Sequence, residues 1–241
     1  MFEIPICLFL FKRTSTLDRI IQRINSVQPR KVYLIADGGR TPEEHLLCVE
    51  CRAYAESLLD PTIEIVRHYS DSNVGVYQNI GLGAKWVFER EEKAIFVEDD
   101  NLPATTFFSF CEQMLDKYSN VEEVLWVCGT NYLGQFDSDY SYLFTRHMLP
   151  CGWASWSKKF LSYYDGELLS LHNPSKRLNF KKSYLIKGCK SLKLYYSQLY
   201  SIKRTKYLVD NYPKQASWDY QMNYSVRSNM YYGISSYKSN Q

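Results

Sequence analysis

The stretch AIFVEDDNLP, residues 94–103, governs how the rest of the chain is interpreted. Its first four residues are apolar and predict a short buried strand, which ends at three adjacent acids, Glu98, Asp99 and Asp100. Adjacent carboxylates repel one another and are costly to remove from water, and a bound cation relieves both costs. Carboxylate oxygens suit Mg²⁺ or Mn²⁺. The alternative is a solvated acidic loop before the helix expected at Thr105–Tyr118, where negative charge is favourable.

Upstream of this stretch, strand and helix patterns alternate. Strands are predicted at Ile4–Phe11, Lys31–Ala36, Thr62–Arg67 and Lys93–Val97, and helices at Thr14–Ser26, Glu43–Leu59 and Tyr77–Glu89. Because strands that alternate with helices form parallel sheets with right-handed crossovers, the pattern predicts an α/β fold of the Rossmann-like kind, with a mostly parallel central sheet flanked by helices.

The pattern changes downstream of the acids. Strands are expected at Val124–Cys128, Tyr140–Thr145 and Tyr231–Lys238, and a helix at Ala216–Val226. The run GWASW, residues 152–156, is interpreted as a loop that leads into a short helix. We find no repeats and no low-complexity linker, so one compact domain spanning residues 1–241 is expected, with a specialised C-terminal part.

Composition narrows the class of protein. No apolar run approaches the roughly 20 residues of a membrane span, and the first residues lack the basic start of a signal peptide. Of the seven cysteines only Cys48 and Cys51 lie close together, so a zinc site is not expected and buried thiols in a reducing cytoplasm are. The expected location is cytoplasmic.

The net charge of +3 conceals a marked asymmetry. Residues 1–175 carry 16 Lys and Arg against 24 Asp and Glu, whereas residues 176–241 carry 13 against 2. The cations of residues 176–206, Lys187 among them, alternate with Tyr and Leu, which is typical of a surface that contacts an anionic membrane or another polyanion. A solvated helix face is the alternative. Nucleic acid is not expected as a partner, because the acidic first part opposes it and no nucleic-acid motif is present.

Three further features follow predicted strands, and ligands bind outside the carboxyl ends of strands in open α/β sheets. Arg13 precedes a helix, where a guanidinium and backbone N–H groups suit phosphate. Asp37, followed by two glycines, suits a base or a ribose hydroxyl. The helix start at residues 79–85 is rich in small residues, which lets its backbone approach a diphosphate. Lys85 is expected to face this diphosphate. The plainer alternatives are an exposed arginine, a turn and incidental glycine spacing, but together with the acids these features predict a nucleotide-diphosphate site with a divalent cation.

Aromatic residues and one isolated acid stand out later in the chain. Trp153 and Trp156 flank two small residues, and indole faces can stack on sugar rings, with packing in the core as the alternative. Trp218 precedes Asp219, an acid in an aromatic and basic surrounding that suits a general base. For Asp219 the alternative is a helix N-cap.

In chain order, these motifs resemble bacterial glycosyltransferases of the GT-A fold, above all the family-2-like enzymes of surface polysaccharide assembly. The residues that carry the resemblance are Arg13-Thr14, Asp37-Gly38, Asn73-Val74-Gly75, Glu98-Asp99-Asp100, Gly152–Trp156 and Trp218–Gln221. The layout is also similar to that of the eukaryotic N-acetylglucosaminyltransferase that begins complex N-glycans. The resemblance implies metal-dependent, inverting transfer of a sugar from a nucleotide-diphosphate donor, such as a UDP-sugar, to a glycan or lipid-linked glycan.

The resemblance also implies roles for individual residues. Asp100 would hold Mn²⁺ or Mg²⁺ on the donor phosphates, and Glu98 and Asp99 would lie near the ribose or sugar. Arg13 and Lys85 would contact the diphosphate, and Asp37 would bind the uracil or ribose. On the acceptor side, Asp219 would deprotonate the hydroxyl group, and Trp153, Trp156 and Trp218 would contact the acceptor. Residues 1–128 would form the half that binds the nucleotide sugar, and residues 129–241 the half that binds the acceptor. With its basic segment, 176–206, the protein would lie peripherally at the inner face of the membrane.

Two other functions stay open on the sequence alone. A sugar-nucleotide nucleotidyltransferase shares carboxylates at strand ends, but it needs a glycine-rich loop after the first strand, which residues 12–14 lack. The other is a non-catalytic protein that binds a nucleotide sugar or a glycan. Hydrolysis of the donor in the presence of Mn²⁺ separates an enzyme from such a binder.

Overall fold

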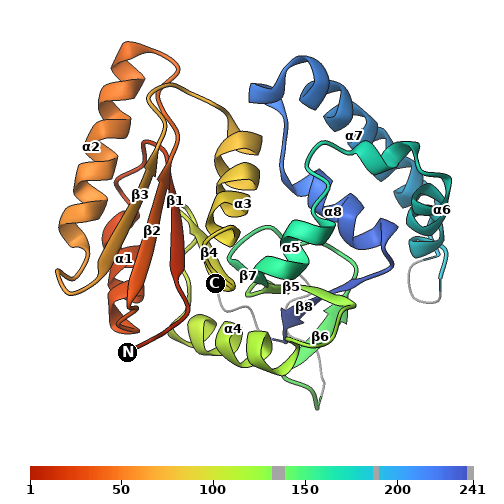
Figure 1. Ribbon diagram of the computed structural model, residues 1–241, viewed down its shortest axis with the longest axis horizontal. Helices are drawn as coiled ribbons and strands as arrows, with labels where there is room; N and C mark the ends of the chain where they lie inside the picture. The colour runs from red at the N-terminus through yellow and green to blue at the C-terminus, as the bar shows by residue number, and fades with distance from the viewer. Residues whose placement is uncertain (132–138, 187–189, 238–241) are drawn as a thin grey trace.

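The computed structural model describes residues 1–131, 139–186 and 190–237. The predicted positions Lys187 and Lys238 lie outside the described residues. Within the described ranges the chain forms an α/β fold around one mixed, mostly parallel sheet of eight strands, in the order β3-β2-β1-β4-β7-β5-β8-β6 (Figure 1). This confirms the predicted α/β class with a mostly parallel sheet flanked by helices.

The elements follow the predicted order through the first half. The strands are β1 (Ile6–Leu10), β2 (Lys31–Ala36), β3 (Glu64–Tyr69), β4 (Lys93–Glu98), β5 (Val124–Cys128), β6 (Tyr142–Thr145), β7 (Trp153–Trp156) and β8 (Tyr232–Ser236). The α-helices are α1 (Leu17–Ser26), α2 (Pro42–Leu58), α3 (Gly83–Phe88), α4 (Thr105–Lys117), α5 (Ser157–Tyr163), α6 (Pro174–Ser183), α7 (Leu192–Asn211) and α8 (Asp219–Ser228). Shorter turns of helix are η1 (Tyr77–Leu82), η2 (Leu169–His172) and η3 (Pro213–Gln215).

Strands β3, β2, β1 and β4 pair in parallel, as the alternating pattern predicted. The chain starts in β1, moves outward to β2 and β3, and then returns to pair β4 with the free side of β1. The strand order therefore reverses between β1 and β4. In doubly wound sheets this point opens a crevice at the carboxyl ends of the strands.

The prediction of a loop at GWASW was wrong, whereas the short helix expected after it is present as α5. Trp153–Trp156 forms strand β7, which pairs antiparallel with β4 on one side and with β5 on the other. The strand has only four residues, and all four are buried. Two flanking strands satisfy its backbone, so a segment too short to show a period is held in the middle of the sheet.

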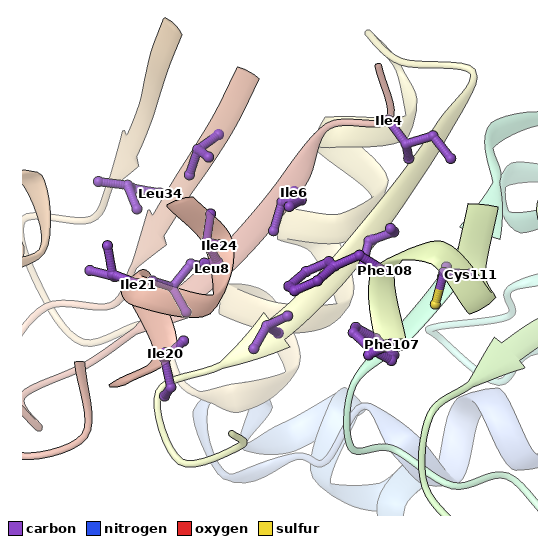
Figure 2. Close-up of a cluster of buried hydrophobic side chains, with 14 of the residues drawn as sticks. Ile4, Ile6, Leu8, Ile20, Ile21, Ile24, Leu34, Phe107, Phe108 and Cys111 are labelled. Carbon is purple, nitrogen blue, oxygen red and sulfur yellow. The ribbon is translucent and has the colours of Figure 1, made fainter. Parts of the chain in front are cut away.

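Helices cover both faces of the sheet. On β1, Ile6, Leu8 and Leu10 point into a core shared with α1, α2 and α4, while Cys7 and Phe9 point into a core shared with α3, α5 and α8. Alternate residues of a strand face opposite sides, so one apolar strand supplies both cores. Figure 2 shows part of the first core, where the isoleucines of α1 and two phenylalanines of α4 meet β1.

The helix predicted at Tyr77–Glu89 is divided. Its first part, η1, is a π-helical turn, and only Gly83–Phe88 is α-helical. The basic segment is also divided, into α6 and α7, which pack with α8 around a small third core of Phe180, Tyr184, Ile202 and Tyr224. Among the described helices, none combines the length and apolar character needed to cross a bilayer.

Candidate functional site

A cavity of about 210 Å³ lies where the strand order reverses. Leu10 and Phe11 from the end of β1 and Glu98 and Asp99 from the end of β4 form part of its wall. Asp37, which follows β2, also contributes. The sequence predicted that these strand ends would meet, and the structure brings Asp37, Glu98 and Asp99 to one cavity. We call this the first cavity.

Asp37 organises one wall of the first cavity. Its buried carboxylate accepts hydrogen bonds from the backbone N–H groups of Gly38, Val74 and Gly75, at 2.8, 2.7 and 3.0 Å, and from the side-chain amide of Asn73 at 2.9 Å. Four donors on two oxygens leave this carboxylate engaged with its own loops. Asp37 was predicted to read a base or ribose, and in this structure its carboxylate binds the loop at residues 73–75.

The loop that Asp37 holds requires glycine at position 75. Gly75 has a φ of +88°, and a Cβ there would lie 2.2 Å from the backbone oxygen of Lys214. Both the left-handed backbone and the close approach exclude other residues. The contact brings Lys214, which is distant in sequence, to the rim of the first cavity.

Asp99 and Asp100 differ in their surroundings although they are adjacent. The carboxylate of Asp99 accepts the N–H of Phe11 at 3.1 Å, and its backbone oxygen accepts the hydroxyl of Thr16, so Asp99 ties the end of β4 to the end of β1. Asp100 is half exposed and lies 3.2 Å from the guanidinium of Arg13, which also approaches Asp99 at 3.7 Å. Burial raises the pKa of Asp99, while the Phe11 N–H and Arg13 lower it.

Arg13 therefore contacts the acidic residues. It was expected at a phosphate, but it is not among the residues that line the first cavity. It lines an adjoining open groove together with Lys12, Thr14 and Asp99. An exposed ion pair of this kind contributes little to stability, so the guanidinium is free to exchange Asp100 for another anion.

Glu98 is the carboxylate of the triplet that faces the first cavity without a hydrogen-bond partner among the described residues. Burial raises its pKa to about 7, and the charges of Asp100, Asp99 and Asp219 add to the effect. The surroundings of Glu98 therefore disfavour its ionised form, and near pH 7 the carboxyl group is only partly ionised. A cation or a hydrogen-bond donor from a ligand would stabilise the ionised form.

Asp219 begins α8 and lines a second cavity of about 220 Å³. The lining is mostly polar and comes from four parts of the chain: His147, Met148, Tyr184, Leu194, Gln198, Asp219, Tyr220 and Asn223. Burial raises the pKa of Asp219, and its charge in turn raises the pKa of Glu98. The second cavity therefore contains a carboxylate that is electrostatically linked to the first.

Lys85 does not lie where it was predicted. It is exposed on α3 and is not among the residues that line the first cavity. The small residues before it serve packing: a Cβ on Gly81 would lie 2.5 Å from the hydroxyl of Tyr164, and one on Gly83 would lie 3.1 Å from Ile35. The helix start approaches neighbouring side chains closely, and this accounts for its glycines.

The three tryptophans expected to contact the acceptor are buried. Trp153, Trp156 and Trp218 are 1%, 5% and 4% exposed. Trp153 stacks on Phe96 and Trp126 with ring centroids 4.0 and 4.2 Å apart, and Trp218 lies against Trp153 at 5.5 Å. The prediction that these rings offer their faces to a sugar is corrected, because both faces of Trp153 are occupied by other rings.

Sequence reasoning missed two cations of the first cavity. Arg40 follows β2, and Lys214 belongs to η3, far along the chain. Arg40 follows the glycines of the Asp37 motif, a position that pointed to a ligand-binding loop. Lys214 gave no signal, since only the contact with Gly75 places it there.

No preformed metal cage is present among the described residues, where no group of three or more His, Cys, Asp and Glu side chains is arranged to hold an ion. A scan with protein-family models finds no match to this chain, and a search of curated proteins finds no relative by sequence. The function is therefore inferred from the residues of the two cavities.

Proposed function

We propose that this protein is a glycosyltransferase of the GT-A kind that takes its sugar from a nucleotide-diphosphate donor. The observation that carries the proposal is the first cavity, which lies at the carboxyl ends of β1 and β4 where the strand order reverses. Nucleotides bind at this position in doubly wound sheets. Arg40 and Lys214 supply positive charge at its wall, which suits a diphosphate.

The acidic triplet is compatible with a divalent ion supplied with the donor. Mg²⁺ is commonly held by one or two carboxylates together with substrate phosphates, so a cluster of three protein ligands is not needed. Glu98 supports this assignment, because its partly buried carboxylate has no hydrogen-bond partner among the described residues and its pKa is raised to about 7. Asp100, which is exposed beside Arg13, would be the second ligand. Such an ion would offset the charge of the departing diphosphate.

Asp219 is the proposed general base. It lies in the second cavity among polar side chains that suit sugar hydroxyls, and burial raises its pKa toward the range in which a base works at neutral pH. The acceptor hydroxyl would lose its proton to Asp219 and attack the anomeric carbon as the nucleotide diphosphate leaves. The acceptor would be a glycan or a lipid-linked glycan.

Calorimetric titration with UDP, in the presence and absence of Mn²⁺, tests donor binding. We expect binding that requires Mn²⁺ and that is lost in Asp100→Ala, while Glu50→Ala, which removes an exposed acid on α2, binds as the wild type does. Equal binding of UDP without Mn²⁺, or by Asp100→Ala, would contradict the metal-dependent site.

Turnover tests the role of Asp219 separately from donor binding. Removing a general base typically costs about 10²–10⁴-fold in rate, so Asp219→Asn should lose turnover on this scale and keep its affinity for UDP and Mn²⁺. Release of UDP from UDP-sugars is the readout. Unchanged turnover would remove Asp219 from the mechanism, and absence of any UDP release by the wild type would favour a non-catalytic binder.

A further inference from the structure

Helix α7 presents one side to the protein and leaves the opposite side uncovered. Ile202 and Thr205 are its two buried residues, and Ile202 belongs to the third core. In Figure 1, α7 lies on the side of the molecule away from α1 and α2. Leu194, Tyr195 and Leu199 are partly buried against the third core, and ten of the 20 residues of α7 are exposed.

The uncovered side carries aromatic and apolar residues in a continuous row. Leu192, Tyr196, Tyr200 and Tyr207 are 52%, 60%, 70% and 56% exposed. With Lys203 between the last two tyrosines, these residues recur every three or four positions and so lie along one face of the helix. Exposed rings in such a row form a surface rather than scattered single contacts.

Cations accompany the row. Lys193, Lys203 and Arg204 are exposed, and none of them has an ion-pair partner among the described residues. The only acid of α7 is Asp210, which pairs with Lys206 at 2.5 Å. The outward face of α7 is therefore both aromatic and positively charged.

We propose that this face of α7 docks on the surface of a membrane that contains anionic phospholipids. Tyrosine rings have an apolar body and a polar tip, which fits the headgroup region, and unpaired cations are attracted to anionic headgroups. The charge of the face is complementary to such a surface. The sequence predicted a membrane contact for the whole segment 176–206, and the structure restricts it to one side of one helix.

Docking there would place the second cavity behind α7, one helix diameter (roughly 10 Å) from the lipid, because its lining residues lie on the other side of the helix from the tyrosine row. Leu194 and Gln198 of α7 line the second cavity, and the amide of Asn223 on α8 donates a hydrogen bond to Gln198 at 2.9 Å. The helix that would lie on the membrane thus forms part of the wall beside Asp219. This consequence rests on the proposed function and selects a lipid-linked acceptor, whereas the docking itself does not depend on catalysis.

Flotation with vesicles tests the docking. Vesicles of phosphatidylcholine alone are compared with vesicles that also contain about one third phosphatidylglycerol. We expect the wild type to float only with the anionic vesicles and to be released by salt. Each cation near such a surface contributes about 1 kcal/mol, so the triple variant Lys193→Gln, Lys203→Gln, Arg204→Gln should bind on the order of 100-fold more weakly.

A second variant and a matched control complete the experiment. Tyr196→Ser, Tyr200→Ser, Tyr207→Ser should weaken flotation without changing net charge. The control Arg19→Gln, Lys85→Gln, Lys158→Gln removes three exposed cations from α1, α3 and α5 and should float as the wild type does. Circular dichroism checks that every variant is folded.

Three results would overturn the docking proposal: wild type that fails to float with the anionic vesicles, variants of α7 that float unchanged, or a control that is weakened as much as they are. A dimer in solution that the tyrosine substitutions dissociate would assign the face to a second copy of the chain instead. Release of UDP from a soluble donor is measured on the same samples. The proposed function can therefore fail while the docking stands, or the reverse.

Discussion

Glu98 ends β4 with a carboxyl group whose pKa is raised from 4.5 to about 7 by burial and by neighbouring acids. The native state therefore holds this proton at pH values where the unfolded chain has lost it, and the free energy of unfolding decreases as pH rises from about 4.5 to about 7. Because glutamine does not ionise, Glu98→Gln removes this decrease in the free energy of unfolding. At pH 8 the variant should be more stable than the wild type by up to about 3 kcal/mol, with a smaller difference at pH 4.

Urea unfolding at a series of pH values measures this difference. Glu50→Gln, an exposed glutamate on α2, is the control and should follow the wild-type pH dependence. Parallel curves for Glu98→Gln and the wild type would mean that Glu98 titrates as an ordinary exposed glutamate does. The same curves taken with Mn²⁺ and UDP show whether the ligand removes the destabilisation.

Asp37 is the second residue for which we predict the effect of a substitution on stability. Asp37→Asn replaces one of two oxygens, each of which accepts two hydrogen bonds, by an amide that faces donors. Replacing a buried carboxylate with this many hydrogen-bond partners should lower the free energy of unfolding by about 2–4 kcal/mol. Chemical denaturation is the measurement. The control is Asp71→Asn, an exposed acid in the connection between β3 and η1, and it should change stability by less than about 0.5 kcal/mol.

At the scale of elements, α5 is fixed to the sheet by one buried lysine. The ammonium of Lys159 donates to the backbone oxygens of Tyr118, Val121 and Val124 at 2.7, 2.8 and 2.8 Å, and lies 3.6 Å from the centroid of the Trp156 ring. Burial lowers the pKa of Lys159 to about 8, and the charges of Glu122 and Glu123 act in the opposite direction. All of its protons are used.

Lys159→Met should therefore destabilise the protein by about 3 kcal/mol, because it leaves three carbonyl groups without their donor. The next residue provides the comparison: Lys158 is exposed, and Lys158→Met should lie within about 0.5 kcal/mol of the wild type. Thermal and urea unfolding give both values. A loss of stability of equal size in the two variants would show that the hydrogen bonds of Lys159 are not responsible.

Elements with a clear period were predictable and those without one were not. Strands β1 to β4 and the apolar stripe of α1 follow from runs and spacings within each segment. Strand β7 has four residues with small side chains between two tryptophans, and its stability comes from antiparallel partners distant in sequence. Such pairing leaves no local signal, so the sequence left open whether the tryptophans stack on a sugar or pack in the core.

At the scale of the whole molecule, the part of the first cavity that is formed by residues at strand ends was predictable from the sequence. Parallel strands place their carboxyl ends at one edge, so the meeting of Asp37, Glu98 and Asp99 follows from the alternating pattern alone. Lys214 lies at the first cavity because its backbone packs against Gly75, and Lys85 is exposed on the short helix α3. Both outcomes depend on tertiary packing, which a motif read along the chain does not contain.

The two cavities draw on different parts of the chain and are linked by charge. Glu98 comes from the first half and Asp219 from α8, yet the charge of Asp219 raises the pKa of Glu98. Asp219→Asn removes that charge, so the pKa of Glu98 should fall and its titration should move to lower pH. Asp210→Asn, an exposed acid on α7, is the control and should leave the pKa of Glu98 unchanged.

Carbon-13 NMR of labelled glutamate side chains follows this titration directly. The direction is fixed by electrostatics, since a neighbouring negative charge always makes ionisation harder and its loss makes ionisation easier. A lower pKa of Glu98 in Asp219→Asn, together with an unchanged one in Asp210→Asn, would establish that the two carboxyl groups sense each other. An unchanged pKa in both would mean that the cavities titrate independently. A joint site across the two halves would then lose its electrostatic support.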